Sequence, residues 1–164
     1  MPALTALLHT HNDALRLGRA LETLYACDHI VIVDHNSHDG TVEIARQYGA
    51  TVIPAQPAAT PARYIQPANH GLIFCLNSNE SVSESLASSL FELKLQLKSE
   101  SNSGQKPATY SVHVREETAH GWIDHSAPQT RIVPPTWSRW IGNLPADDPD
   151  AVALEAELLR FTLP

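Results

Sequence analysis

The stretch that decides the fold of this chain is Ile30-Val31-Ile32-Val33-Asp34-His35-Asn36-Ser37-His38-Asp39-Gly40-Thr41. Its β-branched apolar run predicts a strand buried on both faces, and the polar cluster after it predicts a loop that leads into a helix. Open parallel sheets bind their ligands just beyond the carboxyl ends of their strands. Asp34 and Asp39 are therefore candidate binding residues, although Asp39 also suits the simpler role of a helix cap.

Similar units lie on both sides of this strand. An apolar run at residues 4–8 predicts a first strand, which a polar loop joins to a helix over residues 14–25. A helix over 41–48 precedes a third strand at 51–53. Strand, helix, strand, helix and strand in this order predict right-handed crossovers and a parallel sheet. Both polar loops should therefore emerge at the same edge of the sheet.

The segment after the third predicted strand is rich in proline. Several prolines between Pro54 and Pro67 remove backbone donors, which favours an ordered surface loop over a helix. Residues 72–76 predict a further strand, after which Ser81 and Glu84 resemble a capping box at the start of the longest helix.

The last third of the sequence predicts a smaller, mixed region. We expect a polar loop at 99–107, a strand at 110–115, an extended piece at 130–133 and a terminal helix over 147–164 that offers a surface for a homo-oligomer. The predicted fold class is α/β, a three-layer sandwich around a mostly parallel sheet with a small antiparallel C-terminal portion. Residues 1–164 should form a single compact domain.

Composition excludes several classes of function. The chain has 164 residues, a formal net charge of -7 and a sequence pI of about 5.6, which argues against a nucleic-acid surface. Cys27 and Cys75 lack the spacing of a zinc or redox motif and suit buried thiols in a reducing compartment. No apolar run approaches the ~18 residues of a membrane span. The sequence predicts a cytoplasmic protein, with peripheral contact at the inner membrane left open.

Three strand-end motifs together resemble the signatures of family 2 glycosyltransferases with the GT-A fold. They are Leu7-Leu8-His9-Thr10-His11-Asn12-Asp13, Ile32-Val33-Asp34-His35-Asn36-Ser37-His38-Asp39-Gly40-Thr41 and Leu76-Asn77-Ser78-Asn79-Glu80. In that family the corresponding strands end in P-T-Y-N-E, V-D-x-x-S-x-D-G-T and D-x-D-E, and the middle match is the most specific.

The later part resembles the bacterial lipopolysaccharide-core and cell-surface glycan branch of that family. Gly121-Trp122-Ile123, Gln129-Thr130-Arg131-Ile132 and Trp140-Ile141-Gly142 are similar to its acceptor-side hairpin, R-L-F strand and W-x-G motif. The resemblance implies a nucleotide-binding half at 1–98, a reduced acceptor-side region at 108–146 and then the terminal helix.

The resemblance also implies an activity and a site. The activity would be transfer of a sugar from a nucleotide-diphospho-sugar to a glycan or lipid-linked acceptor. Residues implied at the nucleotide are Thr10, Asn12, Asp34 and Asp39. Arg131 and Trp140 would lie on the acceptor and phosphate side, although an ion pair and core packing are their simpler interpretations.

The sequence differs from the family at the positions that bind the metal and supply the catalytic base. Asn77, Asn79 and Glu80 occupy the positions that hold magnesium or manganese, but two are amides where hard cations prefer carboxylates. Asparagines are also common turn residues. The His-Glu pair that supplies the base is missing near Asn143, so the catalytic residue is unknown. An impaired transferase and a catalytically inactive nucleotide-binding, sugar-binding or assembly domain are both consistent with these changes.

Four histidines support a weaker alternative. His9 and His11 follow the first strand, and His35 and His38 follow the second, so their imidazoles could converge on a transition metal. Exposed loop histidines are the simpler interpretation.

Overall fold

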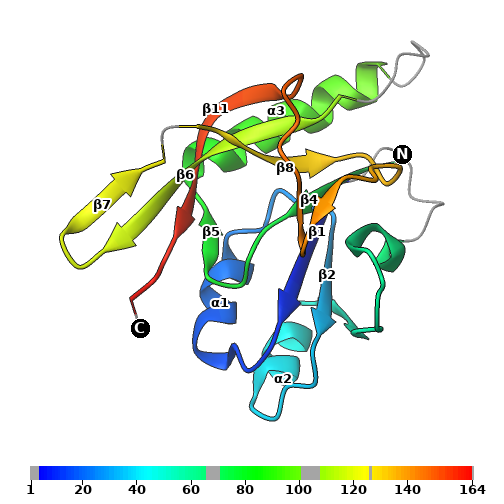
Figure 1. Ribbon diagram of the computed structural model, residues 1–164, viewed down its shortest axis with the longest axis vertical. Helices are drawn as coiled ribbons and strands as arrows, with labels where there is room; N and C mark the ends of the chain where they lie inside the picture. Colours follow the sequence, from blue (N-terminus) through cyan, green and yellow to red (C-terminus); the bar gives the residue numbers. More distant parts are fainter. Residues whose placement is uncertain (1–3, 66–70, 101–107, 126, 164) are drawn as a thin grey trace.

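The computed structural model describes residues 4–65, 71–100, 108–125 and 127–163. Its centre is a nine-stranded sheet with the order β3-β2-β1-β4-β8-β6-β11-β5, in which β7 pairs with β6 beside this path (Figure 1). The strands of this sheet are β1 (Leu4–Thr10), β2 (His29–Asp34), β3 (Thr51–Pro54), β4 (Leu72–Cys75), β5 (Glu80–Val82), β6 (Tyr110–Thr118), β7 (Gly121–Asp124), β8 (Gln129–Val133) and β11 (Val152–Arg160).

The predicted parallel half is confirmed. Strands β3, β2, β1 and β4 are neighbours in this order and run parallel. The helices α1 (Ala14–Glu22) and α2 (Thr41–Gln47) connect β1 to β2 and β2 to β3. Thr10 is the register partner of Asp34, so the loops after β1 and β2 leave the sheet at the same edge.

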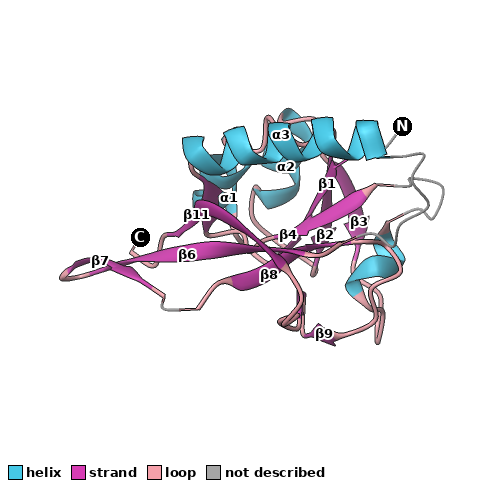
Figure 2. Cartoon of the chain, turned by 90° about the horizontal axis from the view of Figure 1, so that it is seen from above, coloured by secondary structure: helices cyan, strands magenta, loops and turns pink. Residues whose placement is uncertain are grey.

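Helices lie over one face of the sheet, and shorter segments lie under part of the other face (Figure 2). The face that includes Leu8 and Phe74 packs against α1, α2 and α3 (Glu84–Glu100). The other face packs against Tyr64 of the 3-10 helix η1 (Pro61–Tyr64) and against the region of the two-stranded sheet of β9 (Trp140–Ile141) and β10 (Leu144–Pro145). The fold class is the predicted α/β sandwich, with a third layer of loops and one short helix.

The proline-rich segment therefore contains a short helix that we did not predict. Pro61 lies in the first turn of η1, where the missing N–H of proline would have no helical partner in any case. Tyr64 anchors the segment, because its hydroxyl accepts a hydrogen bond from the backbone N–H of Gln56 at 2.8 Å.

The predicted terminal helix is wrong. Residues 152–160 form β11, which runs parallel to β6 and antiparallel to β5. Ala156 and Leu158 are buried while Glu157 between them is half-buried, the period-two pattern of a strand. The open edge of β6 supplies the backbone partners, and this pairing overrides the local preference for a helix. The helix expected to offer a surface for a homo-oligomer is therefore a strand over residues 152–160.

The start of the longest helix also differs from the prediction. Residues 80–82 are β5, and the Oγ of Ser83 accepts a hydrogen bond from Leu86 N–H at 3.1 Å, as the cap of α3. Residues 101–107 of the predicted polar loop and Pro67 lie outside the described residues. No helix in the described ranges combines the length and the apolar character needed to cross a membrane.

Candidate functional site

The carboxylate of Asp34 is fixed at the end of β2. Its Oδ1 accepts hydrogen bonds from the hydroxyls of Thr10 (3.1 Å) and Ser37 (2.6 Å), and its Oδ2 accepts the backbone N–H of Ser37 at 3.0 Å. Burial acts to raise the pKa of Asp34, but the bonds from Ser37 and Thr10 outweigh it and hold that pKa below its ordinary value. Asp34 is therefore a preformed anion at the rim of the sheet.

Asp39 ties the starts of the two helices together. Its Oδ1 accepts the N–H of Thr41 at 3.0 Å and a short bond from the Thr41 hydroxyl, and its Oδ2 accepts the N–H of Ala14 at 3.2 Å. The bond from the Thr41 hydroxyl is the main cause of the lowered pKa of Asp39. The N-cap residues of α1 and α2 are Asp13 and Gly40, so Asp39 is not itself a cap, but its carboxylate accepts the first N–H of both helices.

Asn12 links the two polar loops. Its Oδ1 accepts the N–H of His38 at 2.8 Å, and its own N–H donates to the Oγ of Ser37 at 2.9 Å. A φ of 50° at Asn12 turns the chain for these bonds, a conformation that asparagine tolerates better than most residues. Ser37 and Thr41, which we did not single out, complete a network whose signal was already present in the motif V-D-x-x-S-x-D-G-T.

The histidines do not form the metal site that we considered as an alternative. The Nδ1 of His9 and the Nε2 of His35 share a hydrogen bond of 2.8 Å, and the Nδ1 of His11 lies 2.6 Å from the carbonyl oxygen of His35. In the part of the chain that the structure describes, no group of three or more histidine, cysteine or acidic side chains is arranged to hold a metal. Burial first, and then the charge of His35, lower the pKa of His9 to about 4.

The third motif forms the loop between β4 and β5 and surrounds a buried ion pair. The guanidinium of Arg131 on β8 holds Glu80 with Nη1–Oε1 and Nη2–Oε2 distances of 2.8 and 2.9 Å. The Nε and Nη2 of Arg160 each lie 3.2 Å from Oε2 of the same carboxylate, and the N–H of Asn77 donates to Oε1 at 2.7 Å. Nothing in the sequence pointed to Arg160, because its strand was predicted as a helix.

These residues do not fit a divalent cation. A magnesium or manganese ion needs anionic oxygens, and the carboxylate of Glu80 is 0% exposed with both oxygens bonded to other groups. Asn77 and Asn79 offer only neutral amides. The metal role predicted for this loop and the phosphate role predicted for Arg131, whose side chain is 1% exposed, have no support in this geometry.

Trp140 lies on the face of the sheet opposite the helices. Its indole Nε1 donates to the carbonyl of Trp137 at 3.1 Å, and both rings pack against the core of that face. Asn143, at the position where the resemblance implies a base, is an exposed residue of the turn between β9 and β10. The acceptor-side role of Trp140 stays a prediction beside the core packing that the structure shows.

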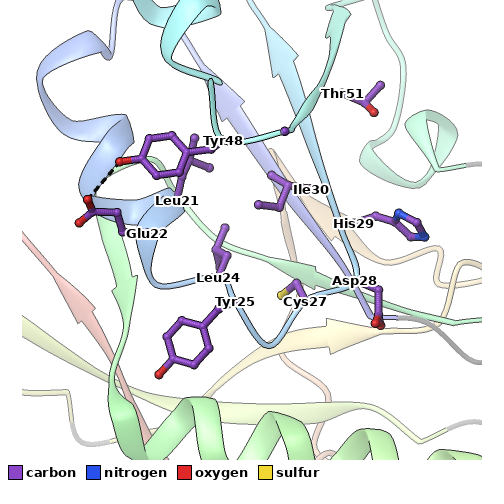
Figure 3. Close-up of a pocket in the computed structure, with 11 residues that line it drawn as sticks. Leu21, Glu22, Leu24, Tyr25, Cys27, Asp28, His29, Ile30, Tyr48 and Thr51 are labelled. Carbon is purple, nitrogen blue, oxygen red and sulfur yellow. Dashed lines mark hydrogen bonds between the residues drawn. The ribbon is translucent and has the colours of Figure 1, made fainter. Parts of the chain in front are cut away.

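A pocket of about 470 Å³ lies at the other end of the sheet (Figure 3). It is lined by residues at the end of α1, the start of β2 and the end of α2, among them Tyr25, His29 and Tyr48. The hydroxyl of Tyr48 donates to Glu22 at 3.1 Å across one side of it. Since β2 begins here and Asp34 lies at its far end, this pocket is separate from the predicted nucleotide site.

Comparison with solved structures defines the class of fold. The structure of S. aureus TarS superposes with a TM-score of 0.50 at 15% identity, over 79% of this chain and 23% of that chain. S. aureus TarS 1-349 in complex with UDP gives a TM-score of 0.51 at 15% identity, over 74% of this chain and 38% of that one. The chain has the GT-A fold of glycosyltransferases.

The chain thus spans well under half the length of those two structures. No family model matches the chain, and no curated protein matches it in sequence. The likeness is one of fold, and the roles of individual residues rest on the geometry described above.

Proposed function

We propose that this chain binds the nucleotide of a nucleotide-diphospho-sugar at the shared edge of β1 and β2. The observation that carries the proposal is the fixed carboxylate of Asp34. A carboxylate accepts about four hydrogen bonds, and Thr10 and Ser37 use three of these sites. The remaining site suits an N–H donor of a base such as uracil. One of the similar structures was solved with UDP, which supports this choice of ligand.

The reaction we propose is transfer of the sugar to a glycan or lipid-linked acceptor. The GT-A fold and the motif around Asp34 support a protein of glycosyltransferase type. The acceptor hydroxyl must lose a proton during transfer, and the residue that accepts it is unassigned.

A second candidate function is a catalytically inactive domain that binds the donor or assists assembly. The amides of Asn77 and Asn79 and the exposed Asn143 favour it, because both the metal ligands and the base are altered. A cytoplasmic location, with contact at the inner membrane, is a further prediction for either function.

Calorimetric titration with UDP tests nucleotide binding. The Asp34→Ala variant should weaken binding about tenfold or more, since a hydrogen bond to a charged group is worth about 1.5–3 kcal/mol. Asp124→Ala is the matched control, because Asp124 is an exposed carboxylate on β7. Equal affinity of both variants for UDP, or no binding by the unaltered protein, would overturn the proposal.

A panel of labelled nucleotide-sugars separates the two candidates. A functional transferase should release free UDP in the presence of an acceptor extract or by slow hydrolysis. Binding without any release supports the inactive domain.

A further inference from the structure

Two arginine side chains meet at the position where the resemblance implies a metal. Glu80 contributes one negative charge, and Arg131 and Arg160 each contribute one positive charge, so these three side chains sum to +1. Glu116, the register partner of Arg160 on β6, is itself paired with His125 at 3.0 Å. The bidentate pair with Arg131 is fully buried and is neutral as a unit. The excess charge therefore belongs to Arg160.

Arg160 is the member of the cluster that solvent reaches. Its side chain is 20% exposed, whereas those of Arg131 and Glu80 are 1% and 0% exposed. Its bonds to Glu80 use Nε and Nη2, and Nη1 lies outside both. The Glu80 carboxylate thus fixes one edge of the guanidinium and leaves the other edge for a ligand.

The β4–β5 loop connects the cluster to the strand that ends at the predicted nucleotide site. The backbone N–H of Leu76, at the start of the β4–β5 loop, donates to the carbonyl of Leu7 on β1 at 3.3 Å. Phe161, next to Arg160, donates its N–H to the carbonyl of Asn79 in the same loop at 2.9 Å. The β4–β5 loop, which is bonded to the residue after Arg160, therefore follows β4, the neighbour of β1, whose end carries Thr10.

We propose that Arg160 replaces the divalent cation and binds the diphosphate of a nucleoside diphosphate directly, so that donor binding needs no metal. A guanidinium matches the geometry of phosphate oxygens and keeps its charge at all relevant pH values. Neutral side chains at Asn77 and Asn79 fit this arrangement, since carboxylates there would repel the diphosphate in the absence of a metal. This inference rests on the nucleotide binding proposed above.

The test compares UDP with uridine, because only UDP carries the diphosphate. Titration of the unaltered protein with UDP should give the same dissociation constant, within about twofold, in excess EDTA and in manganese chloride. The Arg160→Gln variant should weaken UDP binding about tenfold and leave uridine binding, followed by NMR, unchanged. Arg160→Lys, which keeps the charge, should retain part of the affinity for UDP.

Arg115→Gln is the matched control, because Arg115 lies on β6 and is a partly exposed arginine paired with Asp124. It should leave the affinity for UDP unchanged. Thermal unfolding of each variant confirms that the fold is retained.

The results distinguish the two proposals. UDP binding that requires manganese, or an equal loss for UDP and uridine in Arg160→Gln, would overturn the role of Arg160 while nucleotide binding stands. Failure of the unaltered protein to bind either ligand would overturn both.

Discussion

The guanidinium of Arg131 and the carboxylate of Glu80 form a buried bidentate ion pair, although 51 positions separate the two residues in the sequence. The pair joins β8 to β5, two strands that are not neighbours in the sheet. Arg131 also donates to the carbonyl of Cys75 on β4 at 3.3 Å. Arg131 therefore links three strands, β8, β5 and β4, by hydrogen bonds.

Removal of Arg131 should strongly destabilise the protein. In Arg131→Met the carboxylate of Glu80 loses its buried partner and keeps only Arg160 and the N–H of Asn77. Loss of one partner of a buried ion pair typically costs about 3–5 kcal/mol, which is the upper bound here because Arg160 remains. Urea unfolding measures the change in the free energy of unfolding. Arg115→Met, which breaks an exposed pair, should cost no more than about 1 kcal/mol. Similar values for both variants would show that the buried pair has no special structural role.

Replacement of Thr41 by valine should loosen the two polar loops. The hydroxyl of Thr41, a residue with 0% exposure, donates to Asp39 and accepts the N–H of Asp13 at 2.9 Å. Valine has nearly the same shape but leaves the Asp13 donor without this partner, at a cost of about 1–3 kcal/mol. Urea unfolding should show this loss for Thr41→Val and a much smaller one for Thr51→Val, which alters an exposed hydroxyl on β3.

The stability of the protein should fall between pH 6.5 and pH 4 because of His9. Burial and the charge of His35 lower the pKa of His9 from 6.5 to about 4 in the folded state. In this window the unfolded chain binds a proton that the folded chain does not, so the contribution of His9 is complete above pH 6.5 and is lost as the pH falls. Melting temperatures at pH 7.5 and pH 5 measure the effect.

The matched variants of this pH experiment are His9→Gln and His29→Gln. The first removes the half-buried imidazole and should reduce the difference between the two melting temperatures. The second removes an exposed imidazole at the other end of the sheet and should leave that difference unchanged. An unchanged difference in His9→Gln would contradict the assignment.

The terminal strand should be essential for stability. Leu158 on β11 is 0% exposed and packs in the core beneath the helices, so Leu158→Ala should cost about 2–5 kcal/mol. Val152, at the start of the same strand, is 50% exposed, and Val152→Ala should change the free energy of unfolding by about 0.5 kcal/mol or less. Equal effects in urea unfolding would show that β11 is only loosely attached to the sheet.

The amino-acid sequence alone predicted the parallel half of the fold. The apolar run before Asp34, the polar loop after it and the helix from Thr41 are local features, and β1, β2 and β3 pair with strands that a single crossover reaches. The same features predicted that the polar loops after the first two strands would leave the sheet at one edge. The structure confirms this, and the side chains of Thr10 and Asp34 are bonded there. The resemblance to the GT-A glycosyltransferases extended this interpretation to the class of fold.

The tertiary structure decided the rest. β11 is a strand because the edge of β6 offers it backbone partners, which a local reading of residues 147–164 cannot reveal. Glu80 forms buried ion pairs with Arg131 and Arg160, which lie far from it in the sequence. The spacing of residues within the motif does not predict these contacts. The sequence determined the contacts that form between near neighbours in the chain. Contacts between residues far apart in the chain depend on the tertiary structure, because their proximity is set by the path of every strand between them.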